Sequence, residues 1–150
     1  MIKSKDKVAE IEISYRPAIG RKPVVVSSLD AYTELIEFFP TNTIALQERV
    51  VVMYLNRANR VLGIYELSKG GMTCTVVDIR LILSVALKIS AVGIILAHNH
   101  PSGNLQPSAN DRDITNKIKE ACKYFDIRLH DHLIVVPERT YYSFADEGSL

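Results

Sequence analysis

The sequence contains no tryptophan and only two cysteines, and neither sign of charge predominates. Its 150 residues include 18 lysines and arginines against 17 aspartates and glutamates, so the formal net charge is +1. This balance does not indicate a surface made for nucleic acid or for an anionic membrane. Cys74 and Cys122 lie far apart and lack metal or redox spacing, so we expect free thiols in a reducing compartment.

Long apolar runs are also missing. The charged start MIKSKDK leads into no apolar segment of the signal-peptide type, and no run approaches the roughly 20 residues that cross a bilayer. We therefore expect a cytoplasmic protein without a membrane partner. The length fits one domain with its own hydrophobic core, and no repeat or long linker divides residues 1–150.

The pattern of apolar residues predicts both strands and helices. Alternating or continuous apolar stretches predict strands over 8–15, 24–26, 50–55, 60–67, 91–97 and 129–136. Capping residues and a 3.6-residue period predict helices over 29–39, 78–89 and 111–124. Residues 1–45 thus form a strand and helix extension ahead of the core at about 46–147. The predicted fold class is α/β (α+β), with a mixed sheet flanked by helices.

Two histidines stand where the apolar run 91–97 ends. Because residues i and i+2 of a strand point to the same face, His98 and His100 can bind one ion. A Pro-Ser-Gly turn then reverses the chain, and Asp111 lies in the first turn of the next predicted helix. Two imidazoles and a carboxylate leave a fourth tetrahedral position for water, as in a catalytic zinc site.

Each of these residues also has a purely structural interpretation. Ser108 and Asp111 fit a capping box, and we expect one geometry not to serve both the cap and the metal fully. His130 and His132 form a second His-x-His, but no third ligand follows at suitable spacing. We therefore expect these two histidines to have a structural role, and the alternative is that one of them supports a zinc ligand. Cys74 follows a glycine pair, but a nucleophile there needs a histidine partner that the sequence does not identify.

The motifs resemble those of the JAMM (MPN-plus) zinc metalloproteases and, more closely, the RadC-like branch. The resemblance rests on residues 48–55, 70–73, 95–103, 107–111 and 131–134, and covers about two-thirds of the chain. It implies a JAB/MPN domain of the cytidine-deaminase-like sandwich type. RadC-like proteins usually carry a helix-hairpin-helix segment ahead of this domain, and residues 1–45 do not have that pattern.

The resemblance also implies roles for individual residues. His98, His100 and Asp111 would hold Zn²⁺ and so activate a water molecule. Glu48 would take the proton from this water and return it to the departing amine, and the Ser108 hydroxyl would stabilise the oxyanion. Glu66, in the second strand of the predicted hairpin, is the alternative base.

Three functions compete on this basis. The first is a zinc-dependent hydrolase of peptide or isopeptide bonds, with a protein or peptide substrate. The second is a DNA-repair-associated or DNA-processing protein, as the RadC name suggests, which the near-neutral charge does not support. The third is a non-catalytic interaction module of the MPN type, against which the complete ligand set argues. The sequence does not define the oligomeric state.

Overall fold

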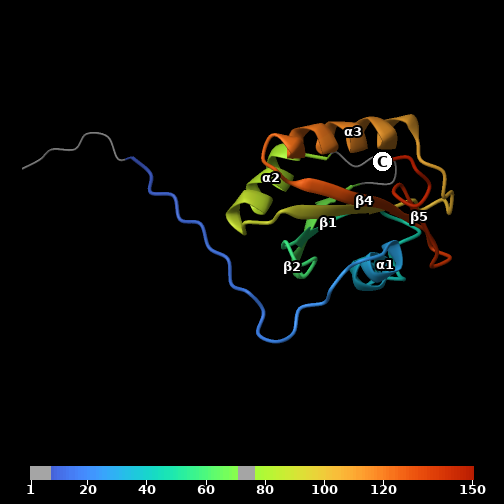
Figure 1. The fold of residues 1–150 in the computed structure, drawn as a ribbon. Coiled ribbons are helices and arrows are strands. Elements are labelled where there is room, and N and C mark those ends of the chain that lie inside the picture. The colour runs from blue at the N-terminus through green and yellow to red at the C-terminus, as the bar shows by residue number, and fades with distance from the viewer. Residues whose placement is uncertain (1–7, 71–76) are drawn as a thin grey trace, which may run out of the picture.

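The computed structural model describes residues 8–70 and 77–150 (Figure 1). The family-like segment 70–73 lies outside the described residues except for Gly70. Cys74, for which the sequence identified no histidine partner, lies wholly outside them. The described helices are α1 (Ser28–Leu35), the 3₁₀ turn η1 (Ile36–Phe38), α2 (Ile79–Lys88) and α3 (Ala109–Lys123). The strands are β1 (Arg49–Leu55), β2 (Val61–Lys69), β3 (Gly93–Asn99), β4 (Arg128–Val135) and β5 (Tyr141–Ser143).

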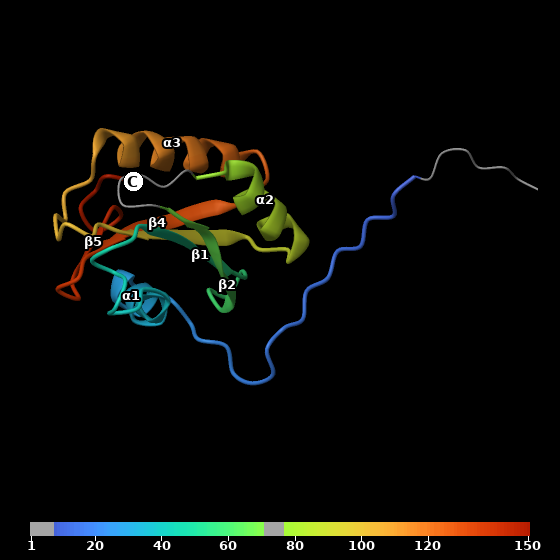
Figure 2. The ribbon, with the colours of Figure 1, turned by 180° about the vertical axis from the view of Figure 1, so that it is seen from behind.

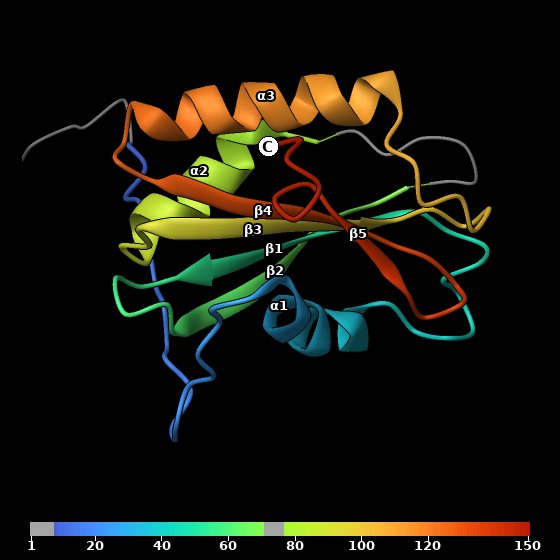
Figure 3. The same ribbon diagram turned by 45° about the vertical axis from the view of Figure 1, so that its right-hand side comes forward.

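These strands form one mixed sheet in the order β2-β1-β3-β4-β5 (Figure 3). Strand β1 pairs antiparallel with β2 and β3, β3 pairs parallel with β4, and β5 pairs antiparallel with β4. Helix α3 makes the connection between the two parallel strands, as such a pair requires. The predicted mixed sheet with flanking helices is confirmed.

Helices cover both faces of the sheet. Figures 1 and 2 show α1 against one face and α2 with α3 against the other. Every residue of β1 and β3 is buried, because these strands lie inside the sheet. Their side chains alternate between two cores. Val51, Met53, Ile95 and Ala97 pack with α1, whereas Val50, Val52, Ile94 and Leu96 pack with α2 and α3.

Local sequence signals explain how the helices begin. Ser27 caps α1 in a capping box with Asp30, so this helix begins one residue before the predicted range. Its α-helical part ends at Leu35, the 3₁₀ turn continues to Phe38, and Phe39, the last residue of the predicted helix, is the cap. Asp78 accepts a hydrogen bond from the N–H of Arg80 and caps α2. None of the helices in the described residues is long and apolar enough to pass through a membrane.

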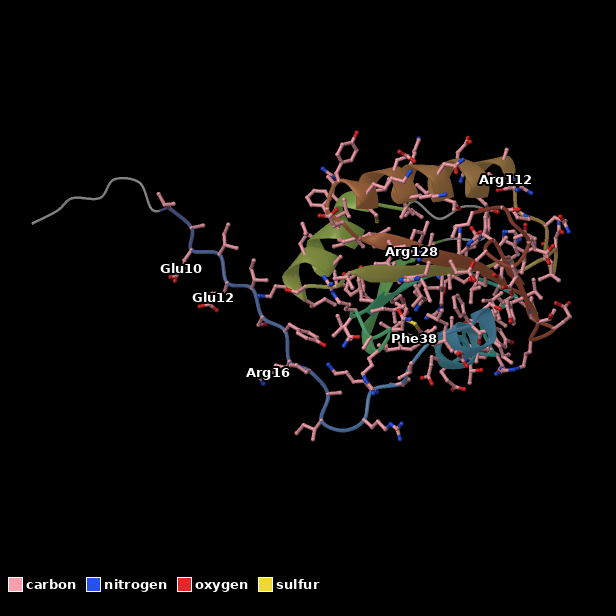
Figure 4. The ribbon with its side chains drawn as sticks, viewed as in Figure 1. Glu10, Glu12, Arg16, Phe38, Arg112 and Arg128 are labelled. Atoms are coloured by element: carbon pink, nitrogen blue, oxygen red, sulfur yellow. The ribbon has the colours of Figure 1, made fainter. Side chains whose placement is uncertain are left out.

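The N-terminal segment departs from the prediction. Residues 8–15 do not form the predicted strand; they are extended, with Val8 94% and Ile11 84% exposed. Figure 4 shows Glu10, Glu12 and Arg16 on this arm, away from the folded body. The predicted strand over 24–26 is reduced to a bridge between Val24 and Arg60. The alternating pattern is present at 8–15, but no ladder partner within the described residues completes it.

Candidate metal centre

The two histidines of the motif lie at the end of β3. His98 is inside the strand and 6% exposed, whereas His100 follows it and is partly buried. The Nε2 atoms of the two rings are 3.0 Å apart. The prediction that both rings turn to the same face of the strand is therefore confirmed.

Helix α3 directs a carboxylate at the same point. Its first turn brings Asp111 Oδ1 within 3.2 Å of His98 Nε2 and Asp111 Oδ2 within 3.2 Å of His100 Nε2. Ser108 is the N-cap, and its Oγ accepts a hydrogen bond from the N–H of Asp111 at 3.0 Å. The sequence therefore placed the helix start slightly late, since α3 begins at Ala109.

Asp111 completes the helix cap in the same geometry in which it faces the two histidines. The expected conflict between this cap and a bound metal ion stays a prediction. Asp111 Oδ2 accepts from the N–H of Ser108 at 2.8 Å, which completes the capping box while the carboxylate still faces both imidazoles. An ionised carboxylate has about four lone-pair sites and can accept several hydrogen bonds at once. The capping box therefore fixes the carboxylate that faces the histidines.

Glu48 approaches from the neighbouring strand. It directly precedes β1, where Val50 is paired with His98 in the sheet. Its carboxylate and ring nitrogens of His98 and His100 all lie within 4.8 Å of one another, an arrangement that could hold a metal ion. Glu66, the alternative base, instead forms an ion pair with Arg49 at 3.0 Å. The structure thus groups Glu48 with His98 and His100, and Asp111 contacts the same two rings. Glu48 is close enough to these histidines to be a ligand as well as a base.

The protonation of this cluster follows from its contacts. Burial lowers the pKa of His100, but hydrogen bonds to Asp111 and the Asn104 carbonyl and the nearby negative charges outweigh burial and raise it overall. Burial alone would raise the pKa of Asp111, yet its close contacts with His100 and His98, which favour the ionised carboxylate most when the rings are protonated, hold that pKa far below its usual range. The cluster therefore keeps an ionised carboxylate facing two imidazoles.

The donor set suits zinc. Imidazole nitrogen and carboxylate oxygen are common zinc ligands, and a tetrahedral ion with bonds of about 2.0–2.1 Å separates neighbouring ligand atoms by roughly 3.3 Å. The ring nitrogens and carboxylate oxygens here are 3.0 to 3.2 Å apart. His100 Nδ1 lies 2.6 Å from the backbone carbonyl of Asn104, which can only accept. Its Nε2 therefore keeps a lone pair for a cation when the ring is neutral.

The second histidine pair is divided between the two faces of the sheet. A register shift between Ile94 and Ile95 turns His132 toward α3, where its Nε2 lies 2.7 Å from His98 Nδ1. His130 instead packs against Gly93. Burial, and then the charge of His98, keeps the pKa of His132 well below its ordinary value. The sequence favoured a purely structural role for His130 and His132. In the structure, His132 contacts the predicted ligand His98.

Two buried residues around the site were not predicted from the sequence. Thr115, one turn after Asp111, donates from Oγ1 to the Asp111 carbonyl and lies 2.6 Å from His132 Nδ1. Asn99 holds the segment that leads to Glu48. The helical spacing of four residues between Asp111 and Thr115 was the available signal for the first.

The fold and the site together define a mixed-sheet α/β domain with a histidine and carboxylate cluster suited to a metal ion. A family model described as the RadC-like JAB domain matches residues 26–149. The chain belongs to this family.

Relatives confirm this assignment. A UPF0758 protein of Flavobacterium johnsoniae is 42% identical over 147 residues, which cover 94% of this chain and 61% of the relative. A UPF0758 protein of Porphyromonas gingivalis is 38% identical over 146 residues, which cover 95% of this chain and 63% of the relative. A UPF0758 protein of Streptococcus gordonii is 43% identical over 104 residues, which cover 69% of this chain and 46% of the relative. The chain thus spans less than two-thirds of the length of these relatives.

Proposed function

We propose that the chain is a zinc-dependent hydrolase that cleaves peptide or isopeptide bonds of a protein or peptide substrate. The observation that carries this proposal is the convergence of the Asp111 carboxylate on the Nε2 atoms of His98 and His100, each 3.2 Å away. Two imidazoles and one carboxylate leave a position for water and substrate, which is typical of catalytic zinc sites. Membership of the JAB family agrees with this chemistry.

Zinc bound here would supply a Lewis acid and a water molecule acidic enough to react near neutral pH. The protein residues would carry out the proton transfers. Glu48, close to both histidines, takes the proton of the water and delivers it to the departing amine. A carboxylate suits this double role because it gains and loses a proton without leaving the site.

Ser108 would stabilise the negative charge that develops on the substrate carbonyl oxygen. Its Oγ accepts from the N–H of Asp111, and this bond uses a lone pair rather than the hydroxyl proton. The proton can therefore be donated to the oxyanion. The same hydroxyl thus serves the cap and the reaction, because the two roles use different parts of it.

The first test is zinc content. Wild type, Asp111→Asn and the control Asp113→Asn, an exposed residue of the same helix, are purified without chelator and measured by elemental analysis. We expect about one zinc per chain in wild type and the control, and a loss in Asp111→Asn. Wild type that takes up no zinc even after reloading would overturn the proposal.

The second test is turnover. Zinc-loaded protein is incubated with a defined peptide library and with isopeptide-linked lysine peptides, and new amino groups are counted by mass spectrometry. We expect cleavage by wild type and by Glu66→Gln, whereas Glu48→Gln keeps zinc and loses cleavage. Loss of zinc from Glu48→Gln would make Glu48 a ligand. A zinc-loaded wild type that cleaves neither substrate class would favour the interaction module.

A further inference from the structure

A chain of three hydrogen bonds runs behind the candidate metal centre. Thr115 Oγ1 lies 2.6 Å from the Asp111 carbonyl oxygen and 2.6 Å from His132 Nδ1. His132 Nε2 then lies 2.7 Å from His98 Nδ1. Thr115 and His132 are each 1% exposed, so water does not compete for these bonds. The chain links α3, β4 and β3 at the level of the site.

The direction of these bonds is fixed from one end. A backbone carbonyl can only accept, so Thr115 must give its single hydroxyl proton to Asp111. Toward His132 the hydroxyl can then only accept, which places a proton on His132 Nδ1. His132 is buried and stacked on the Phe144 ring at 4.7 Å, an environment that favours the neutral imidazole.

The direction then determines the state of His98. A neutral His132 that carries its proton on Nδ1 has a lone pair on Nε2, and this atom must accept from His98 Nδ1. A neutral His98 therefore has no proton on Nε2. This lone pair faces Asp111 and His100, where the metal ion would be bound. The Asn104 carbonyl imposes the same state on His100.

We propose that His132, supported by Thr115, is a positioning residue that fixes the tautomer of His98 and so presents its Nε2 to the metal. The inference rests on the proposed zinc site. Without the chain, His98 could move its proton to Nε2 and donate it to Asp111 Oδ1, 3.2 Å away, which would close the site in the metal-free protein. Asp111 takes part twice, because its carboxylate faces the histidines and its carbonyl sets the direction of the bonds.

The direct test is the tautomer of His98 in the metal-free protein. Histidine labelled with ¹⁵N is studied by long-range ¹H–¹⁵N correlation at pH 8, where an ordinary imidazole is neutral. We expect the proton on Nδ1 in both His98 and His132, and a change in that pattern in Thr115→Val. Thr115→Ser should restore it, because serine keeps the hydroxyl. Finding the proton on Nε2 of His98 in wild type would overturn the inference.

The matched control is Thr33→Val. Thr33 Oγ1 also bonds to the carbonyl four residues earlier, that of Leu29, but on the exposed side of α1. Its replacement removes the same kind of helix bond without touching the chain. We expect no change in the tautomer of His98 or in zinc affinity. If Thr33→Val changed the tautomer of His98 or the zinc affinity as much as Thr115→Val does, the effect would be a general loss of stability and not a property of the hydrogen-bond chain.

A second readout is zinc affinity, measured by competition with a chromophoric chelator. His132→Phe keeps a ring beside Phe144 but removes the acceptor for His98, and we expect zinc to bind roughly 10- to 100-fold more weakly. Unchanged affinity would overturn the inference while leaving the hydrolase proposal intact. If His132→Phe does not fold, the inference is tested by comparing the tautomer of His98 in Thr115→Val and Thr115→Ser. Wild type that binds zinc but cleaves nothing would overturn only the hydrolase.

Discussion

The side chain of Asn99 accepts a hydrogen bond from the backbone N–H of Arg49 at 2.7 Å. Asn99 stands between the two histidines of the motif but points to the opposite face of β3, where it is completely buried. Its amide group donates to the carbonyls of Ile44 and Gln47 at 2.8 and 2.9 Å. The middle residue of the motif therefore fixes the chain on both sides of Glu48.

This arrangement predicts a large effect of Asn99→Asp. The carboxylate has the same shape and can still accept from Arg49, but it cannot donate to the two carbonyls. Buried acceptors then lose their partners beside a buried charge, and we expect the free energy of unfolding to fall by about 3 kcal/mol or more. Urea denaturation measures it, with the exposed Asn116→Asp as the control. A loss below about 0.5 kcal/mol, usual for surface changes, would contradict the role of Asn99.

Gly93 predicts a second measurable effect. A Cβ atom at this position would lie 2.5 Å from His130 Nε2 and 2.6 Å from His130 Cδ2, so the ring depends on the absence of a side chain. We expect Gly93→Ala to destabilise the protein by about 1–3 kcal/mol through overpacking. The double variant with His130→Ala should lose much less than the sum of the two single variants. Additive losses would show that the cost of Gly93→Ala does not come from contact with the His130 ring.

Cys122 should react slowly while the protein is folded. The thiol lies on the buried face of α3, fully inside the core, and burial raises its pKa to about 11. Only about one thiol in a thousand would be ionised at pH 8, against roughly a quarter in an unfolded chain with a pKa near 8.5. We expect the Cys74→Ser variant to react with a disulfide reagent at least about 100-fold faster in denaturant than without it.

The opposite outcome, equal rates in the two conditions, would place Cys122 at the surface. The pKa shift also has a sign for stability. Because the folded pKa is raised, the unfolded chain releases its proton first as the pH rises above about 8.5, and stability from this group is lost between there and about 11. Cys122→Ala should reduce that dependence.

Much of the site could be predicted because its signals are local. The alternation in β3 directs His98 and His100 to one face, and Ser108 with Asp111 marks the start of α3. Short-range patterns of this kind are read from a few neighbouring residues. The turn and the place of Asp111 in the first helical turn allowed it to face the histidines, but this spacing fits a cap equally well. The family resemblance favoured the metal-binding interpretation.

The remaining features depend on long-range register. His132 meets His98 across 34 positions only because β4 is displaced by one residue beside β3. Strand β5, Tyr141–Ser143, is too short to give a period and forms because β4 offers it an edge. Residues 8–15 show the reverse case, in which the alternating pattern exists without a described neighbouring strand.

The N-terminal arm predicts where a protease acts first. Arg21 is exposed beside Gly20, shortly before Pro23, whose carbonyl accepts from the N–H of Val61 at 2.9 Å. Earlier in the arm, the Tyr15 hydroxyl donates to the Leu62 carbonyl, and Lys88 Nζ donates to the Ile13 carbonyl. Trypsin does not cut before proline, which protects the bonds after Arg16 and Lys22. Within the described arm, cleavage should therefore occur after Arg21 and give a product that begins at Lys22.

This product should remain folded. The described residues that this cleavage removes include Ile11 and Ile19. These side chains are 84% and 105% exposed, so they contribute little buried apolar surface. We expect its melting temperature to lie within about 4 °C of the intact protein, equivalent to a change of roughly 1 kcal/mol. Intact-mass measurement identifies the cut, and Arg21→Gln should abolish it. A first cut inside β1 or β2, or a product that melts much earlier, would show that the arm is part of the folded body.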